Sequence, residues 1–158
     1  MAQRDELTGL MNRRAFLKSA VYLVSLYNRT HMPMVFVFAD LDNFKQVNDS
    51  MGHDVGDQVL KQLGFLAANH FRITDIKARY GGDEFVFILA DSHLDDATKV
   101  VSRFEEQFSD WAKKNSIPVG ISFGVIEAGG EKVALDTLMK AVDEALYAEK
   151  KKKKGRVA

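Results

Sequence analysis

The chain has 158 residues, 46% of them hydrophobic and 28% charged, a composition typical of a soluble globular domain with a substantial core. Lysine and arginine together number 22, as do aspartate and glutamate, so no net charge favours nucleic acid or an anionic membrane as a partner. Cysteine is absent, which excludes disulfides, thiolate metal sites and cysteine nucleophiles. No apolar run approaches the roughly 20 residues that span a bilayer.

Hydrophobic periodicity predicts four helices and four strands. In chain order they are a helix over residues 16–27, a strand over 34–39, a helix beginning near 52, two hairpin strands over 76–80 and 85–89, a helix over 94–111, a strand over 119–126 and a helix over 135–146. A short polar–apolar segment over residues 44–51 precedes the second helix. The β-α-β-β-α-β order predicts an α+β, ferredoxin-like core with an antiparallel sheet and helices on one face. An extra N-terminal helix and an extra C-terminal helix flank this core.

Three details of these elements are expected from local sequence. Gly124 is expected to break the last strand, and Asp91-Ser92 to start the third helix. The lysine run over residues 150–154 is expected to be a solvated helix end, at the negative pole of the helix dipole.

The hairpin carries the most unusual local chemistry. Gly81-Gly82 separates its two strands and predicts a tight primed turn, which needs φ > 0 at both central residues. Asp83 and Glu84 follow directly, and two adjacent carboxylates near a buried hairpin repel each other and cost desolvation energy. They need either a cation or a turn that leaves them in water, so a turn with solvated acids is the alternative.

Asp40 ends the first strand, which neighbours the hairpin in the predicted topology. Its carboxylate can therefore lie beside Asp83 and Glu84. Three carboxylates without imidazole or thiolate favour Mg²⁺ or Mn²⁺, and two strand ends of this kind can hold two ions that clamp an in-line displacement at phosphorus. The alternative for Asp40 is a cap on the next helix.

No phosphate-binding loop of the Gly-x4-Gly-Lys-Ser/Thr type is present, so metal, single lysines and backbone amides must hold any phosphates. Lys45 can neutralise charge on a transferring phosphoryl group, or it is a solvated helix lysine. Asn48 and Asp57 can supply the amide and carboxylate that read a guanine edge. Asp57 is otherwise a surface acid on the second helix.

Six motifs follow one another from Asp5 to Lys150, nearly the whole chain. They are Asp5-x-Leu7-Thr8-Gly9-Leu10-x-Asn12-Arg13-Arg14, Asp40-x-Asp42-x-Phe44-Lys45-x-x-Asn48-Asp49, Gly52-His53-x-x-Gly56-Asp57, Arg79-Tyr80-Gly81-Gly82-Asp83-Glu84-Phe85, Ser122-Phe123-Gly124 and Asp143-x-Ala145-Leu146-Tyr147-x-x-Lys150. In content and order they resemble the GGDEF domain family, the diguanylate cyclases. The resemblance implies a palm-like nucleotidyltransferase that condenses two GTP into the bacterial second messenger cyclic di-GMP, with release of two pyrophosphates.

The resemblance also implies a role for each matching residue. The metal ligands would be Asp40, the Leu41 carbonyl, Asp83 and Glu84, with Glu84 on the second of two Mg²⁺ or Mn²⁺ ions. Asp83 would also assist deprotonation of the attacking 3′-hydroxyl, and Lys45 would act at the phosphates. The implied substrate-binding residues are Phe44, Asn48, His53, Asp57 and Lys150, the last at the terminal phosphates. His53 alternatively caps or packs a helix.

The reaction joins two GTP molecules, so the resemblance implies a transient homodimer of domains. We expect residues 1–158 to be one catalytic domain of a longer cytoplasmic signalling protein, which can be membrane-anchored elsewhere. The rival interpretation is a non-catalytic GGDEF-like module that binds GTP or cyclic di-GMP and signals through a partner. The C-terminus departs from the family, because Gly155-Arg156 follows the lysine run two residues late. This leaves open whether Arg156 reaches phosphate.

Arg72-x-x-Asp75, six residues before Gly81, resembles the family's product-binding motif. An arginine can donate two hydrogen bonds to guanine O6 and N7, and a carboxylate can accept from N1 and N2. Arg79 is expected to add a third contact from the same edge. The resemblance implies non-competitive inhibition by cyclic di-GMP held there. The alternative is a local ion pair that closes the second helix.

Overall fold

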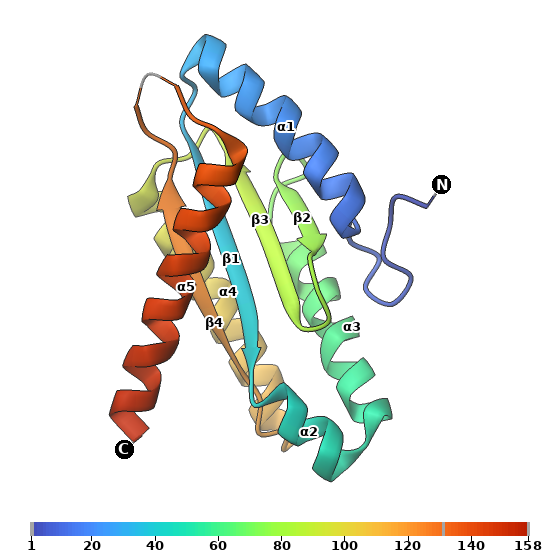
Figure 1. Ribbon diagram of the computed structural model, residues 1–158. Helices are drawn as coiled ribbons and strands as arrows, with labels where there is room; N and C mark the ends of the chain where they lie inside the picture. Colours follow the sequence, from blue (N-terminus) through green and yellow to red (C-terminus); the bar gives the residue numbers. More distant parts are fainter. Residues whose placement is uncertain (1, 131, 158) are drawn as a thin grey trace.

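The computed structural model describes residues 2–130 and 132–157. Its elements are α1 (Arg13–Thr30), β1 (Met34–Asp42), α2 (Phe44–Met51), α3 (His53–His70), β2 (Ile76–Arg79), β3 (Glu84–Ala90), α4 (Leu94–Lys114), β4 (Gly120–Glu127) and α5 (Leu135–Val157). The strands form one antiparallel sheet in the order β2-β3-β1-β4 (Figure 1). The predicted α+β, β-α-β-β-α-β core is confirmed, and the segment over residues 44–51 is a helix. No helix of the described ranges is long and apolar enough to cross a membrane.

Helices cover both faces of the sheet, and the central strands β1 and β3 are therefore buried on both sides. On one face, Val35 and Val37 of β1 pack in a core built with α3 and α4. On the other face, Phe36 and Phe38 pack in a core built with α1 and α5. The expectation of helices on one face therefore holds for α3 and α4 alone, and the two terminal helices cover the opposite face.

Strand β4 is not broken at Gly124, contrary to the expectation. Gly124 pairs with Phe38 of β1 in a continuous ladder. A Cβ at Gly124 would overlap the backbone of Val142 and Leu146 in α5. Glycine is required there because α5 lies directly on the strand, which is the close backbone approach that a strand glycine often marks.

The β2–β3 hairpin forms, but its turn is not the predicted primed turn. The strands are joined by residues 80–83, and neither Gly81 nor Gly82 has a left-handed φ. The amides of Tyr80 and Gly81 both donate to the Glu84 carbonyl, at 2.8 and 3.2 Å. A Cβ at Gly81 would overlap the Glu84 carboxylate, whereas Gly82 faces open space. At Gly81 the crowding comes from the flexible end of a side chain and not from backbone conformation.

Helix α4 begins later than Asp91-Ser92. Its N-cap is His93, which makes no side-chain capping bond. The Leu94 amide instead donates to the Glu127 carboxylate of β4 at 2.6 Å. The start of the helix is satisfied by a distant strand, which local sequence does not reveal.

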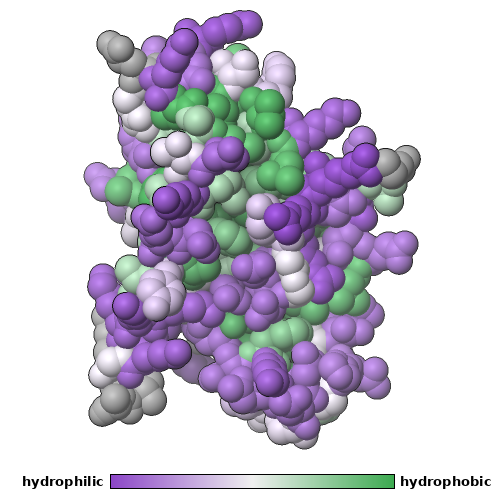
Figure 2. All heavy atoms as spheres, in the orientation of Figure 1, coloured by the Kyte–Doolittle hydropathy of each residue, from purple (hydrophilic) through white to green (hydrophobic). Residues whose placement is uncertain are grey.

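Two left-handed residues turn the chain sharply at one end of the sheet. Asn43 (φ 65°) lies between β1 and α2, and Gly52 (φ 94°) lies between α2 and α3. As a result α2 lies at the same end of the molecule as the hairpin loop and the C-terminal part of α5, the lower end in Figure 1. Figure 2 shows mainly hydrophilic residues over the lower half of this face, while the hydrophobic residues gather in the upper half.

Candidate active site

The end of β1 lies beside the hairpin loop, as the predicted topology requires. Asp40 is the register partner of Glu84, and the Leu41 amide donates to the Asp83 carbonyl at 3.1 Å. The side chains of Asp40 and Asp83 lie within hydrogen-bonding distance of each other. The structure therefore brings these two predicted carboxylates together.

The cluster has more negative charge than its surroundings neutralise. Burial, the Asp40 charge and the hydrogen bond to Asp40 raise the pKa of Asp83 to about 6. Burial, followed by the charges of Asp40 and Asp143, also raises the pKa of Glu84, while Arg13 and Lys150 act in the opposite direction. Both shifts indicate that a cation would be stabilised here.

The oxygens at this point fit a divalent ion. Asp40 Oδ1 is buried and has no hydrogen-bond partner among the described residues, while Oδ2 lies 2.9 Å from Lys150 Nζ. The Asp83 amide donates no bond to the Leu41 carbonyl in the described parts of the chain. Mg²⁺ typically takes one or two carboxylates and completes its shell with water or phosphate.

The structure does not form a ready-made cage of three carboxylates. Within residues 2–130 and 132–157, no three His, Cys, Asp or Glu side chains form a group that could hold a metal ion alone. Asp40 and Asp83 are in contact, and Glu84 lies over Gly81 next to them. An ion would need backbone, water or phosphate oxygens as further ligands.

A cleft of about 350 Å³ opens between these acids and α5. Its lining residues are Asp40, Glu84, Asp143, Glu144, Leu146, Tyr147 and Lys150. Lys150, predicted to reach phosphate, lies in this cleft, and its Nζ is also 3.8 Å from Asp42. It is placed at the site, and in the structure it is paired with carboxylates.

Sequence reasoning assigned no role to Asp42 and Lys153. Asp42 accepts hydrogen bonds from the buried Ser122 hydroxyl, at 2.8 and 3.0 Å, and from Lys153 Nζ at 2.9 Å. Lys153 also donates to the Ile121 carbonyl at 2.7 Å, so the prediction of a fully solvated lysine run is wrong at this position. Spacing was the available signal, because Asp40 and Asp42 share one strand face and residues three apart share a helix face. The side chain of Arg156 lies outside the described part of the structure.

The predicted nucleotide-binding residues lie around the corner between α2 and α3. Phe44 packs against the core, whereas Lys45 is exposed at the start of α2. The half-buried Asn48 amide lies against Gly56, where any Cβ would overlap it. His53 and Asp57 are exposed on the first turns of α3. The corner is therefore an open polar surface at the same end of the molecule as Asp40.

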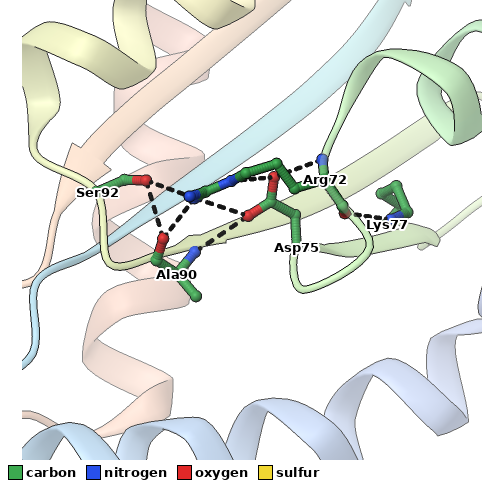
Figure 3. A network of polar contacts seen from close by, with 5 residues as sticks. All are labelled: Arg72, Asp75, Lys77, Ala90 and Ser92. Carbon is green, nitrogen blue, oxygen red and sulfur yellow. Dashed lines mark hydrogen bonds and ion pairs between the residues drawn. The ribbon is translucent and has the colours of Figure 1, made fainter.

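Arg72 and Asp75 form a dense network at the opposite end of the hairpin (Figure 3). Arg72 Nη2 lies 3.2 Å from Asp75 Oδ1 and donates to the Ala90 carbonyl and to Ser92 Oγ. The Asp75 side chain is 3% exposed and also accepts from the amides of Arg72 and Ala90. The expected alternative, a local ion pair after the second helix, is thus formed. A hollow of about 290 Å³ adjoins the pair.

Arg79, which is expected to add a third contact to the product from the same edge, bonds to other partners than Arg72 and Asp75. Its Nη1 lies 3.2 Å from Asp5 Oδ1, and its Nε and Nη2 donate to the Gly82 carbonyl at 3.1 and 2.7 Å. Burial opposes ionisation of Asp5, but hydrogen bonds from Thr8 and the Arg79 charge lower its pKa overall. Arg79 therefore ties the N-terminal segment to the hairpin loop.

Comparison with known proteins places the chain in a family. The family model described as "Diguanylate cyclase, GGDEF domain" matches residues 2–156. The chain is 36% identical over 155 residues to the response regulator PleD of Caulobacter vibrioides, covering 95% of this chain and 34% of that protein. It is 37% identical over 160 residues to the probable diguanylate cyclase DgcE of Escherichia coli, covering 99% of this chain and 14% of that protein. The chain thus spans about a third or less of the length of these relatives.

The fold is similar to that of a microbial GGDEF domain, whose solved structure shows a mode of interaction between that domain and cyclic di-GMP. The TM-score is 0.83 at 29% identity, covering 95% of this chain and 94% of that chain. Family match, sequence relatives and fold all agree with the motifs along the chain. The chain is a member of the GGDEF, or diguanylate cyclase, family.

Proposed function

We propose that this domain is a diguanylate cyclase that condenses two GTP into cyclic di-GMP. The observation that carries the proposal is the contact of Asp40 with Asp83 beside a buried carboxylate oxygen to which no described residue bonds. In the reaction, the 3′-oxygen of each GTP attacks the α-phosphorus of the other. Each attack forms one P–O bond and breaks the bond to a departing pyrophosphate.

Asp40, the Leu41 carbonyl, Asp83 and Glu84 would hold the Mg²⁺ or Mn²⁺ ions, two per site in our proposal. Bound ions of this kind supply charge stabilisation at the reacting phosphate. Asp83, whose pKa is raised to about 6, would help remove the proton of the 3′-hydroxyl. Lys45 would neutralise charge on the transferring phosphoryl group, and Lys150, at the edge of the cleft, would reach the terminal phosphates.

The α2–α3 corner would hold the nucleoside. Asn48 would donate to guanine O6 and Asp57 would accept from N1 and N2, with His53 and Phe44 beside the ribose and base. Each domain then binds one GTP, so two domains must face each other in a transient homodimer. We propose that residues 1–158 act as one cytoplasmic catalytic domain within a longer signalling protein.

Feedback inhibition by the product belongs to the same proposal. Arg72 already presents its guanidinium at a surface hollow and is 56% exposed, while Asp75 holds it in place. We propose that these two residues bind a guanine of cyclic di-GMP. Since they lie at the far end of β2 and β3 from Asp83, the bound product leaves the GTP site free.

The test is incubation of the purified chain with GTP and Mg²⁺, followed by chromatography of the nucleotides. Product should form, and its rate should rise more than linearly with protein in dilute solution. Asp83→Asn should abolish turnover, whereas Asp110→Asn, an exposed acid on α4, should not. Absence of cyclic di-GMP at high protein concentration would contradict the proposal. GTP binding without turnover in a forced dimer would instead support the non-catalytic module.

A further inference from the structure

Helix α5 rests on the end of β1 through two ion pairs in succession. The face of β1 that carries Phe36 and Phe38 against α5 continues with Asp40 and Asp42, because alternate strand residues share a face. Lys150 pairs with Asp40 at 2.9 Å, and one turn later on the helix Lys153 pairs with Asp42 at 2.9 Å. The apolar contact between helix and strand thus becomes a charged one at the candidate site.

The two pairs differ in how completely the carboxylate is satisfied. Asp40 keeps one buried oxygen to which no described residue bonds. Both oxygens of Asp42 accept hydrogen bonds, because the Ser122 hydroxyl lies within bonding distance of each of them and Lys153 Nζ donates to Oδ2. Lys153 is also fixed by the Ile121 carbonyl. Asp40 therefore has an oxygen that can bind a cation, whereas both oxygens of Asp42 are already bonded.

We propose that Lys153 is a positioning residue that compensates the charge of Asp42 beside the cation site and holds α5 so that Lys150 faces Asp40. This inference rests on the proposed metal-dependent function. Lys150 Nζ lies 2.9 Å from Asp40 and 3.8 Å from Asp42, so the two carboxylates lie on either side of one ammonium group. Without Lys153, Asp42 keeps its hydrogen bonds from Ser122 but loses the positive charge that compensates it, so a second uncompensated strand carboxylate acts on the cation site beside Asp40.

The lysine run supplies matched controls. Lys152 pairs with the exposed Glu149 at 3.3 Å, and Lys151 lies over the Tyr147 ring. Both carry the same charge on the same helix turn as Lys153, but neither bonds to β1 or β4 in the described part of the structure. Lys152→Met therefore changes the net charge as Lys153→Met does, without removing the charge that compensates Asp42.

The experiment measures Mn²⁺ binding to the nucleotide-free chain by electron paramagnetic resonance. Lys153→Met should bind Mn²⁺ about fivefold more tightly than the parent, the effect expected when the charge that compensates Asp42 is removed beside a partly exposed cation site. Lys152→Met should match the parent. Lys153→Arg should also match it, because the guanidinium keeps the charge. The gain should disappear in Lys153→Met combined with Asp42→Asn, and that dependence is what a merely structural role of Lys153 would not produce.

Equal Mn²⁺ affinity in Lys153→Met and Lys152→Met would overturn the inference, as would a gain that persists without Asp42. Turnover is measured separately with GTP and Mg²⁺. Turnover without the gain rejects the role of Lys153 and keeps the proposed function. The gain without turnover keeps the role of Lys153 and rejects the cyclase.

Discussion

The two ends of the β2–β3 hairpin carry two acidic residues in opposite states. At one end, Asp75 is buried and accepts hydrogen bonds from Arg72 and Ala90, so its charge is compensated within the chain. At the other end, Asp83 lies against Asp40 and its pKa is raised to about 6. The first acid stabilises the fold, whereas the second is tolerated at a cost. An acid that its own chain leaves uncompensated indicates where a ligand is required.

Neutralising the two acids should change stability in opposite directions, and this is the largest expected effect. Asp75→Asn leaves Arg72 without its partner and should lower the free energy of unfolding by about 2–3 kcal/mol. Asp83→Asn removes like-charge repulsion and should raise the unfolding midpoint at pH 7. Thermal denaturation of the metal-free chain measures both, with Glu106→Gln as the exposed control. A loss of stability in both variants would contradict the comparison.

A divalent cation should cancel the difference between the two ends. Mg²⁺ or Mn²⁺ at ten to a hundred times its dissociation constant should stabilise the parent by about 1.4–2.7 kcal/mol at pH 7, because it binds only the folded chain. The shift should vanish in Asp83→Asn and persist in Glu106→Gln. Thermal shift assays with and without chelator provide the measurement, and an equal shift in Asp83→Asn would place the ion elsewhere.

Acid should act on the metal-free chain in the same direction as a cation. The pKa of Asp83 is raised in the folded state from 3.8 to about 6, so the folded chain binds a proton more tightly than the unfolded chain. The resulting stabilisation is present below about pH 4 and is lost as the pH rises through about 6. Relative to Asp83→Asn, the parent should therefore gain stability between pH 7 and pH 5. No difference between their pH profiles would contradict the raised pKa.

The smallest effect on turnover is expected at Arg72. Arg72→Ala should change the initial rate less than about twofold, because the residue lies at the far end of the hairpin from Asp83, and remote sites couple weakly. It should abolish the slowing that accumulates with product. Progress curves with added cyclic di-GMP measure this, with Lys99→Ala as an exposed control on α4. An unchanged slowing, or a mere rise in the apparent KM for GTP, would reject the assigned product site.

The sequence predicts the elements, their order and the meeting of Asp40 with Asp83, because these follow from periodicity and from the neighbours that the topology allows. The sequence does not predict contacts of a side chain with a partner far away in the chain. Arg79 bonds to Asp5, 74 residues away, and Lys153 bonds to Asp42, 111 residues away. Local rules gave the wrong turn at Gly81-Gly82 as well, because the loop is closed by the Tyr80 and Gly81 amides, which both donate to the Glu84 carbonyl, and neither glycine has a left-handed φ.

The bridge between Met11 and Ala78 has a mechanical consequence. The Met11 amide donates to the Lys77 carbonyl at 3.1 Å, and the Arg79 amide donates to the Met11 carbonyl at 2.9 Å, so the segment before α1 runs along the outer edge of β2. The Arg79 guanidinium forms an ion pair with Asp5 and donates a hydrogen bond to the Gly82 carbonyl in the hairpin loop. Residues 4–11 are therefore bonded both to the edge strand β2 and, through Arg79, to the loop that bears Asp83, so a force applied to this segment acts on that loop through these bonds.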